Sequence, residues 1–572
     1  MIRALIAWAL KQRIVVVVVA LVIAVFGLIG LRSLAVDAFP DVTNVQVQIA
    51  AEAPGRAPEE VERFVTVPIE IAMRGVPGLV EMRSLNRNGL SLVTLVFTDS
   101  TDVFFARQMV LERLIEVTER MPEGVTPVLG PLSTGLGEIY QYTLEHPSDG
   151  DRALTLDELK QRRDIQDWVV RPMLRSVPGV AEINSQGGYV KQYQVIASPE
   201  KLRYYGFTVR DLHSALARNN ANSSGGALPV KAEQYLIRGT GLIQSLDDIR
   251  NIVLKEVRGI PVFVKDVAEV RFGQEVRRGA IIKNGYTEAV AGIVMMQRGG
   301  NAREVVGRIK SEVERINASG VLPDGLKIVP FYDRSDLVNA ALSTVAKVLV
   351  EGIVLVVVVL FVFLGDVRSS LIVVCTLVLT PLMTFLVMGE IGLSANLMSL
   401  GGLAIAIGLM VDGAVVVVEN AFAKLGHARM SLGLRKEHYI LEAASDVGKP
   451  VLYGVGIIIL VFLPLLSLQG MEGKMFAPLA LTIAIALAIS LLLSFTLTPA
   501  LCSYLLKGGK EEDTFVLRLI RRPYMKALDW CMAHGKTVVA GAIALMISAL
   551  ACIPLLGTAF IPTMAEGSLT PV

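Results

Sequence analysis

Long apolar runs separate a membrane-spanning part of the chain from a polar part. Crossing a bilayer takes about 20 predominantly apolar residues in a helix. Runs close to that length occupy residues 14–31, 340–364, 371–389, 397–419, 451–468, 479–505 and 537–556. We assign 1–31 to the first transmembrane helix, 336–506 to helices two to six and 537–556 to the seventh. The pattern predicts a polytopic α-helical membrane protein with an α+β domain outside the bilayer.

Positive charge predicts the orientation of the spans. Lys and Arg are frequent in segments 1–13, 421–449 and 507–536. The loop 389–396 contains none, and 469–478 contains only Lys474. Because Lys and Arg concentrate in cytoplasmic loops, the N-terminus and 507–536, a linker with an amphipathic helix, are predicted to be cytoplasmic. The polar segment after the first span then lies on the opposite side.

The polar segment contains an internal repeat. Val76–Ser84 recurs with substitutions as Val177–Ser185, and both copies follow an amphipathic helical pattern and begin a strand pattern. The first copy predicts, in order, a strand at 44–50, a helix at 57–74, strands at 79–86 and 90–97, a helix at 102–120 and a last strand. This is the ferredoxin-like βαββαβ order. Two such units are predicted, at 32–134 and at 135–186 with 287–335.

The second unit is interrupted by an inserted domain, residues 187–286. It contains a run of small polar residues, predicted as an exposed loop, that includes Asn220, Ser223, Gly225 and Gly226. Such a loop is either disordered or an arm that binds a neighbouring molecule, and the sequence favours neither alternative.

An acid interrupts the fourth span. Asp412 lies inside the apolar run Leu397–Asn420, where a carboxylate costs about 2.5–3.5 kcal/mol. We predict that it binds and releases protons; the alternative is a paired structural acid. Glu419, two helical turns later on nearly the same face, is either a second relay group or an interfacial acid.

Small and polar residues accompany this acid. Close helix packing near the relay is predicted at Gly408, Gly413, Asn396 and Asn420, because small side chains let helices approach each other.

Composition agrees with a membrane protein and excludes several functional classes. Of 572 residues, 53% are hydrophobic and 19% charged; the net charge is +2 and the mean hydropathy +0.55. The chain has no basic tract with interleaved aromatic residues, typical of nucleic acid binding, and no GxSxG, Walker A or HExxH motif. We predict a non-enzymatic protein without nucleic acid partners or a permanently bound cofactor.

The two ends of the chain resemble each other. Lys11–Pro40 and Lys536–Pro562 each consist of a basic flank, an apolar span and a Phe-containing segment that ends in Pro. Parallel repeats of this kind occur in transporters. We expect 557–572 to begin a second outer segment that is truncated, with a natural half-transporter as the alternative.

Several motifs resemble the heavy-metal efflux branch of the resistance-nodulation-division (RND) transporters. They are Phe39–Val47, Thr101–Gln108, Ser133–Tyr140, Gly188–Val195 and Asn396–Gly402. The resemblance extends over essentially the whole chain and implies a proton-driven antiporter that expels Zn/Co/Cd or Cu/Ag cations. It also implies a homotrimer in the inner membrane of Gram-negative bacteria, with a periplasmic adaptor (membrane fusion protein) and an outer-membrane channel.

The resemblance also assigns parts of the chain. The two βαββαβ units are similar to the porter subdomains, and the inserted domain is similar to the docking domain, whose loop reaches the next protomer. Asp412 corresponds to the proton carrier of the family.

The metal class stays open. Gly413 follows Asp412 where drug exporters have a second acid, which favours the metal branch. Ala406 stands where the cobalt-zinc-cadmium type has an acid, as in the copper/silver type, whereas the outer motifs favour the divalent type. His146 and His213 are isolated, and the family's metal ligands lie in a second half, so the metal ligands are unknown. The sequence is also compatible with an RND exporter of organic compounds or with a non-transporting half-protein.

Overall fold

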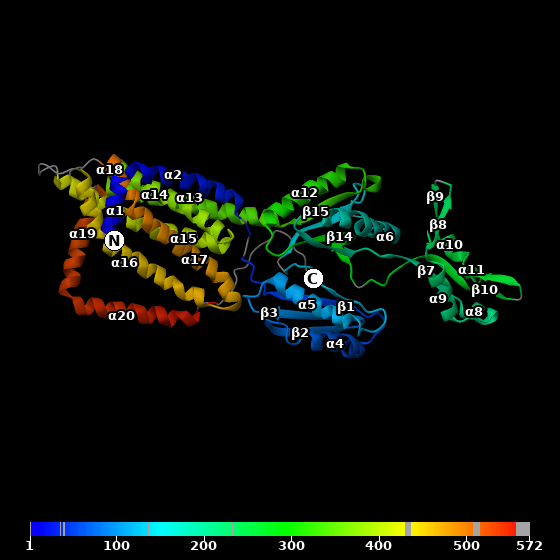
Figure 1. Ribbon diagram of the computed structural model, residues 1–572. Coiled ribbons are helices and arrows are strands. Elements are labelled where there is room, and N and C mark those ends of the chain that lie inside the picture. Colours follow the sequence, from blue (N-terminus) through cyan, green and yellow to red (C-terminus); the bar gives the residue numbers. More distant parts are fainter. Residues whose placement is uncertain are drawn as a thin grey trace. The chain divides into compact units, whose positions relative to one another are not determined.

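The computed structural model describes most of the chain (Figure 1). The described residues are 2–34, 36–37, 40–134, 137–150, 152–231, 233–257, 259–277, 279–428, 436–506, 515–555 and 557. They fall into two compact units, the first formed by 1–139, 296–307 and 332–572 and the second by 140–295 and 308–331. The predicted repeat at Phe560–Pro562 and most of 557–572 lie outside the described residues.

The first compact unit contains the helices that the apolar runs form, together with shorter or charged helices. These are α1 (Ile2–Lys11), α2 (Arg13–Ser33), α13 (Arg334–Leu364), α14 (Val367–Glu390), α15 (Leu397–Ala428), α16 (Lys436–Phe462), α17 (Gly470–Phe495), α18 (Leu497–Leu505), α19 (Phe515–Ala533) and α20 (Gly535–Cys552). Among the described residues, six helices are long and apolar enough to cross a membrane. The chain is therefore a membrane protein.

One predicted span differs from the structure. The span predicted at 340–364 lies within the single helix α13. The span predicted at 479–505, in contrast, is broken at Thr496, between α17 and α18. Pro499 explains this break, because its ring lacks an N–H and clashes with the carbonyl four residues earlier, at the last residue of α17.

The first βαββαβ unit is built on a four-stranded sheet. Its strands are β1 (Gln46–Glu52), β2 (Leu79–Arg87), β3 (Leu90–Phe97) and β4 (Pro127–Leu129). Their order is β2-β3-β1-β4, which is the ferredoxin-like order expected for βαββαβ. The helical segments are α3 (Pro58–Val61), the π-helical turn η1 (Glu62–Thr66), α4 (Val67–Met73) and α5 (Val103–Thr118). They bury a common core with the sheet, including Ile49, Leu95 and Val110.

The second βαββαβ unit repeats this topology. Its strands are β5 (Glu138–Glu145), β6 (Val180–Gly187), β14 (Thr287–Met296) and β15 (Lys327–Asp333), and β13 (Ile281–Lys283), from the end of the insertion, is added at the edge. The order is β13-β14-β5-β15, and β6 also pairs with β14. The helical segments are α6 (Leu156–Ile165), the π-helical turn η3 (Gln166–Val170), α7 (Arg171–Arg175) and α12 (Ala302–Ala318). The prediction of two βαββαβ units is confirmed.

The repeat extends to a detail of helix geometry. In both units the first helical segment contains a π-helical turn, and a proline, Pro68 or Pro172, stands two residues after it. Proline cannot donate the N–H that would continue an α-helical ladder.

The inserted domain has its own core. It contains β7 (Lys191–Ala197), β10 (Val253–Val257), β11 (Ile260–Phe263), β12 (Ala268–Gln274), α8 (Pro199–Tyr205), α9 (Val209–Arg218), α10 (Leu246–Arg250) and α11 (Val264–Val267). Buried Leu202, Leu212 and Val264 belong to this core.

The predicted exposed loop of this domain is wrong in its secondary structure. Ser223–Val230 forms strand β8, which pairs with β9 (Glu233–Gly239) in an exposed hairpin (Figure 1). The register shifts between Ser224 and Ala227, where Gly226 adopts a φ of +77° that favours glycine. The pairing with β9 satisfies the backbone of a sequence whose Asn, Ser and Gly content indicates a loop.

Candidate functional site: an acidic stripe on α15

Close packing against α17 fixes the rotation of α15 about its axis. A Cβ on Gly402 would lie 2.7 Å from the backbone oxygen of Leu479, and one on Gly413 would lie 3.1 Å from Oγ of Ser494. Eleven residues are about three helical turns, so both glycines lie on one face. The hydroxyl of Ser490 donates to the backbone oxygen of Met410 at 2.8 Å across the same contact.

A different face of α15 is exposed and contains both acids. Gly408, Asp412 and Glu419 follow each other at intervals of four and seven residues and are exposed. A Cβ on Gly401 or Gly408 would meet no atom within 4 Å. We call these four positions, Gly401, Gly408, Asp412 and Glu419, the acidic stripe. Within the described part of the chain, no hydrogen bond or ion pair joins either carboxylate to another residue.

Two polar residues, one just before α15 and one within it, hold the helix in place. Asn396 is buried, accepts from the backbone N–H of Ser399 at 2.9 Å and donates its own N–H to the Ser399 hydroxyl at 2.9 Å. This reciprocal cap satisfies two backbone groups at the helix start. Asn420 donates its side-chain amide to the backbone oxygen of Ala443 on α16 at 2.8 Å. Gly413 thus lies in a helix contact, whereas Gly408 faces open space.

A buried ion pair lies near the N-terminal end of α15. Asp37, four residues after α2, donates its N–H to the backbone oxygen of Ala395, next to the cap. Its carboxylate lies 3.4 Å from Nη2 of Arg334, the first residue of α13, and the side-chain exposures are 23% and 8%. The pair therefore joins the ends of α2 and α13 to the loop before α15. Sequence reasoning missed it, although both residues stand at ends of apolar runs.

Burial raises the pKa of Asp37 to about 6, although the Arg334 charge lowers it; the Asp41 charge adds to the rise. Between about pH 4 and 6 the folded state then holds a proton that the unfolded state has lost. Stability falls as pH rises through this window. A shift from 3.8 to about 6 corresponds to about 3 kcal/mol.

We expect the purified chain to unfold at a higher temperature at pH 5 than at pH 7.5, and Asp37→Asn to reduce this difference. Thermal denaturation in detergent at the two pH values measures it. An unchanged difference in the variant would assign the pH dependence to other groups.

Two basic side chains hold the segment that leads into β1. Lys474, near the start of α17, lies 2.5 Å from Asp99 and donates to the backbone oxygen of Thr43 at 3.2 Å. Arg298 donates to the backbone oxygens of Thr43 and Asn44, both at 3.1 Å. These contacts connect a membrane helix to the first sheet, and spacing along the sequence gave no signal for them.

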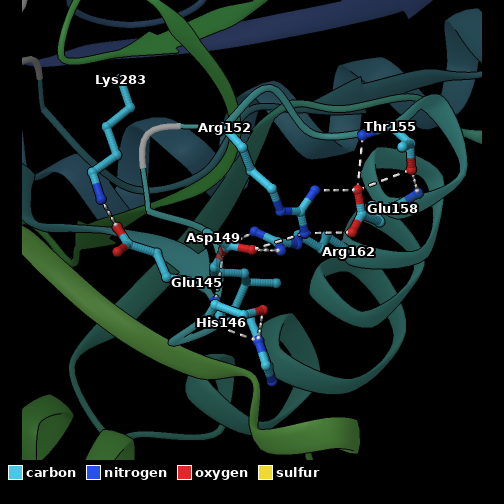
Figure 2. A network of polar contacts seen from close by, with 10 residues as sticks. Glu145, His146, Asp149, Arg152, Thr155, Glu158, Arg162 and Lys283 are labelled. Carbon is cyan, nitrogen blue, oxygen red and sulfur yellow. Dashed lines mark hydrogen bonds and ion pairs between the residues drawn. The ribbon is translucent and has the colours of Figure 1, made fainter.

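A polar network fastens a loop of the second unit (Figure 2). Asp149 accepts from Nη2 of Arg162 and from the N–H of His146, both at 2.7 Å. Glu158 accepts from Nη2 of Arg152 at 2.6 Å and from the N–H of Thr155 at 2.8 Å. A hollow of about 240 Å³ lies beside these residues. Because both carboxylates are already paired with Arg side chains, the network is suited to holding the loop on α6.

The inserted domain presents the remaining predicted site residues. Asn220 accepts from the N–H of Ile243 at 3.1 Å and so closes the base of the hairpin. Ser223 pairs with Gly239 at its start, and Gly225 and Gly226 lie in the bulge. Tyr235 and Leu236 on β9 are 54% and 83% exposed. The hairpin is thus an exposed arm with apolar side chains.

No ready-made metal site is found in the part of the chain that the structure describes. No group of three or more His, Cys, Asp or Glu residues there could hold a metal ion. The Nδ1 atom of His146 lies 2.6 Å from the hydroxyl of Ser148. Met296 is buried in the core.

Comparison with known proteins gives consistent matches. Residues 5–572 match the AcrB/AcrD/AcrF family. The chain is 43% identical over 580 residues to the cobalt-zinc-cadmium resistance protein CzcA of Cupriavidus metallidurans, covering 100% of the chain and 54% of the relative. It is 37% identical over 582 residues to the cation efflux system protein CusA of Escherichia coli K12, again covering 100% and 54%.

A solved structure agrees with these matches. A crystal structure of a heavy metal efflux pump has a TM-score of 0.81 and 32% identity, covering 96% of this chain and 52% of that one. The chain spans about half the length of the relatives it matches.

Proposed function

Because the chain belongs to the AcrB/AcrD/AcrF family, we propose that it contributes the proton-coupled part of a pump that expels heavy-metal cations. The acidic stripe is the observation on which this proposal rests. It places a carboxylate within a membrane-spanning helix, with no partner among the described residues. An intramembrane acid without a structural partner is typical of proton pathways.

The proposed mechanism is linkage between protonation and helix packing. Protonation of Asp412 removes a charge from the stripe and changes which helix arrangement is favoured. Glu419 transfers protons between Asp412 and the membrane surface. Each proton that moves inward supplies about 2.3 kcal/mol per 100 mV of membrane potential.

The contacts around α15 offer routes for this movement. The Asn396 cap and the Ala395–Asp37 hydrogen bond connect α15 to the end of α2, and Lys474 connects α17 to the first sheet. A shift of α15 against α17 therefore changes the forces on the segment that leads into β1. We propose that the two βαββαβ units, 32–134 and 135–186 with 287–335, open and close the cation pathway.

The assembly is also part of the proposal. The pump is a homotrimer in the inner membrane of a Gram-negative bacterium, and domain 187–286 docks a periplasmic adaptor and an outer-membrane channel. The cargo is a divalent cation of the Zn, Co or Cd class, and the 43% identity to a cobalt-zinc-cadmium resistance protein supports this choice. Both metal and protons are transported, and neither is a resident cofactor.

Metal tolerance tests the proposal. Cells that produce the transporter with its adaptor and channel are expected to grow at higher Zn, Co or Cd concentrations than cells with an empty vector. Protection against Cu and Ag alone would change the metal class. Protection against organic toxicants alone would indicate an organic exporter, and no protection would indicate a non-transporting half-protein.

The hairpin is proposed to reach into a neighbouring protomer. Leu236→Ser removes the most exposed apolar side chain of the arm, so we expect a smaller trimer fraction by light scattering after size-exclusion chromatography. Val276→Ser is the matched control, because Val276 is 90% exposed but lies outside the hairpin. Equal trimer fractions in both variants would mean that the hairpin does not contribute to trimer assembly.

A further inference from the structure

Helix α19 differs in composition from the membrane helices on either side of it. The residues Phe515–Ala533 include Arg518, Arg521, Arg522 and Lys526, with Asp529 as the one acid. The helix lies in the chain between α18 and α20 and runs crosswise to α20 (Figure 1). A charged helix in this position is suited to a membrane surface and not to the bilayer core.

Helical geometry gathers the cations on one face. At about 100° per residue, the four basic positions and Asp529 fall within an arc of roughly 140°. All four basic side chains are exposed, and with Met525 they line a hollow of about 460 Å³. We call this the basic face of α19.

The opposite face is apolar. Ile520, Tyr524 and Trp530 project from it and are 48%, 58% and 54% exposed. Trp and Tyr concentrate where a bilayer meets water. A basic face opposite an apolar one with aromatic anchors is the pattern of a helix that lies in the interface.

Local acids leave an excess of positive charge. Residues 507–536 contain seven Lys or Arg and four Asp or Glu, which gives 7 − 4 = +3. Three of these acids, Glu511, Glu512 and Asp513, precede the helix. Arg522 and Lys526 stand furthest from them along the chain and are the informative positions to test.

We propose that α19 binds the headgroups of anionic phospholipids. Its basic face contacts headgroup phosphates, while Ile520, Tyr524 and Trp530 lie among the upper acyl chains. The proposal is independent of the transported substrate, because it concerns a helix remote in sequence from the acidic stripe.

Retention of lipid by the detergent-solubilised full chain tests this inference. Native mass spectrometry at matched lipid concentrations is expected to show phosphatidylglycerol bound in preference to phosphatidylcholine. The double variant Arg522→Gln/Lys526→Gln should weaken phosphatidylglycerol binding about 25-fold, since each basic residue near an anionic surface contributes roughly fivefold in affinity. Raising the salt concentration should weaken wild-type binding in the same direction.

A matched control distinguishes this site from general charge. Arg368→Gln/Lys449→Gln removes two exposed cations from α14 and α16 and is expected to leave lipid retention unchanged. Circular dichroism verifies that both double variants keep their helix content. Equal retention of the two lipids by the wild type, or equal losses in both variants, would overturn the proposal.

Discussion

Asp412→Asn is expected to abolish metal tolerance in cells that produce the full transporter, lowering it to that of cells without the transporter. Asparagine keeps the size and polarity of the side chain but cannot release a proton, so the coupling between protons and helix packing is lost. Assembly should persist, because the Asp412 side chain is exposed and makes no hydrogen bond or ion pair among the described residues. Growth on graded zinc, cobalt and cadmium measures the effect, and size-exclusion chromatography measures assembly.

Gly408→Ala provides the control one helical turn away on the same stripe. A Cβ there meets no atom within 4 Å in this chain, so a tolerated change separates the loss of the carboxylate from disturbance of the surface. Metal export at the normal rate by Asp412→Asn would contradict the proton-carrier role. Loss of tolerance with equal severity in Gly408→Ala would assign the effect to packing of the stripe.

Local periodicity made the acidic stripe predictable. Seven residues are two helical turns, so spacing alone places Asp412 and Glu419 on one face of any helix. The βαββαβ units were equally accessible, because Val76–Ser84 and Val177–Ser185 repeat in the sequence. Spacing could not tell which face is covered, since that depends on Gly402 and Gly413 meeting α17.

Contacts between segments far apart in the chain could not be predicted from the sequence. Asp37 and Arg334, or Lys474 and Asp99, are far apart in the chain, and only the fold brings them together. The hairpin was missed for another reason. Asn, Ser and Gly indicate a loop by local preference, but pairing with β9 overrides that preference. The break at Thr496 had a sequence signal, Pro499, within an otherwise continuous apolar run.

Asp149→Ala is expected to destabilise the loop 146–155 and the start of α6 by about 3–5 kcal/mol, the usual cost of removing one partner of a buried ion pair. Arg162 is 8% exposed and Asp149 15% exposed, and their side chains lie 2.7 Å apart. Among the described residues, the alanine variant leaves the guanidinium of Arg162 with one hydrogen-bond acceptor, the backbone oxygen of Leu144 at 3.0 Å. It also removes the acceptor of the His146 N–H, as Figure 2 shows.

The pH dependence of this loop has a defined direction. Burial raises the pKa of Asp149, but hydrogen bonds from Arg162 and the His146 N–H, with the charges of Arg162 and Arg152, outweigh it and hold the pKa below 3.8. A lowered carboxyl pKa stabilises the fold above the unfolded pKa and loses that contribution as pH falls through the folded one. The wild-type loop should therefore loosen only below about pH 4.

Native-state hydrogen exchange of the full chain measures both effects, through the amides of β5 and α6. Asp157→Ala is the matched control, because that carboxylate is 94% exposed and its ion pair with Lys160 is 3.4 Å long. Exposed pairs of this kind contribute about 0–1 kcal/mol, so its exchange should stay close to wild type. Equal exchange in the two variants would mean that the Arg162 guanidinium finds another acceptor, and the network of Figure 2 would then not fasten the loop.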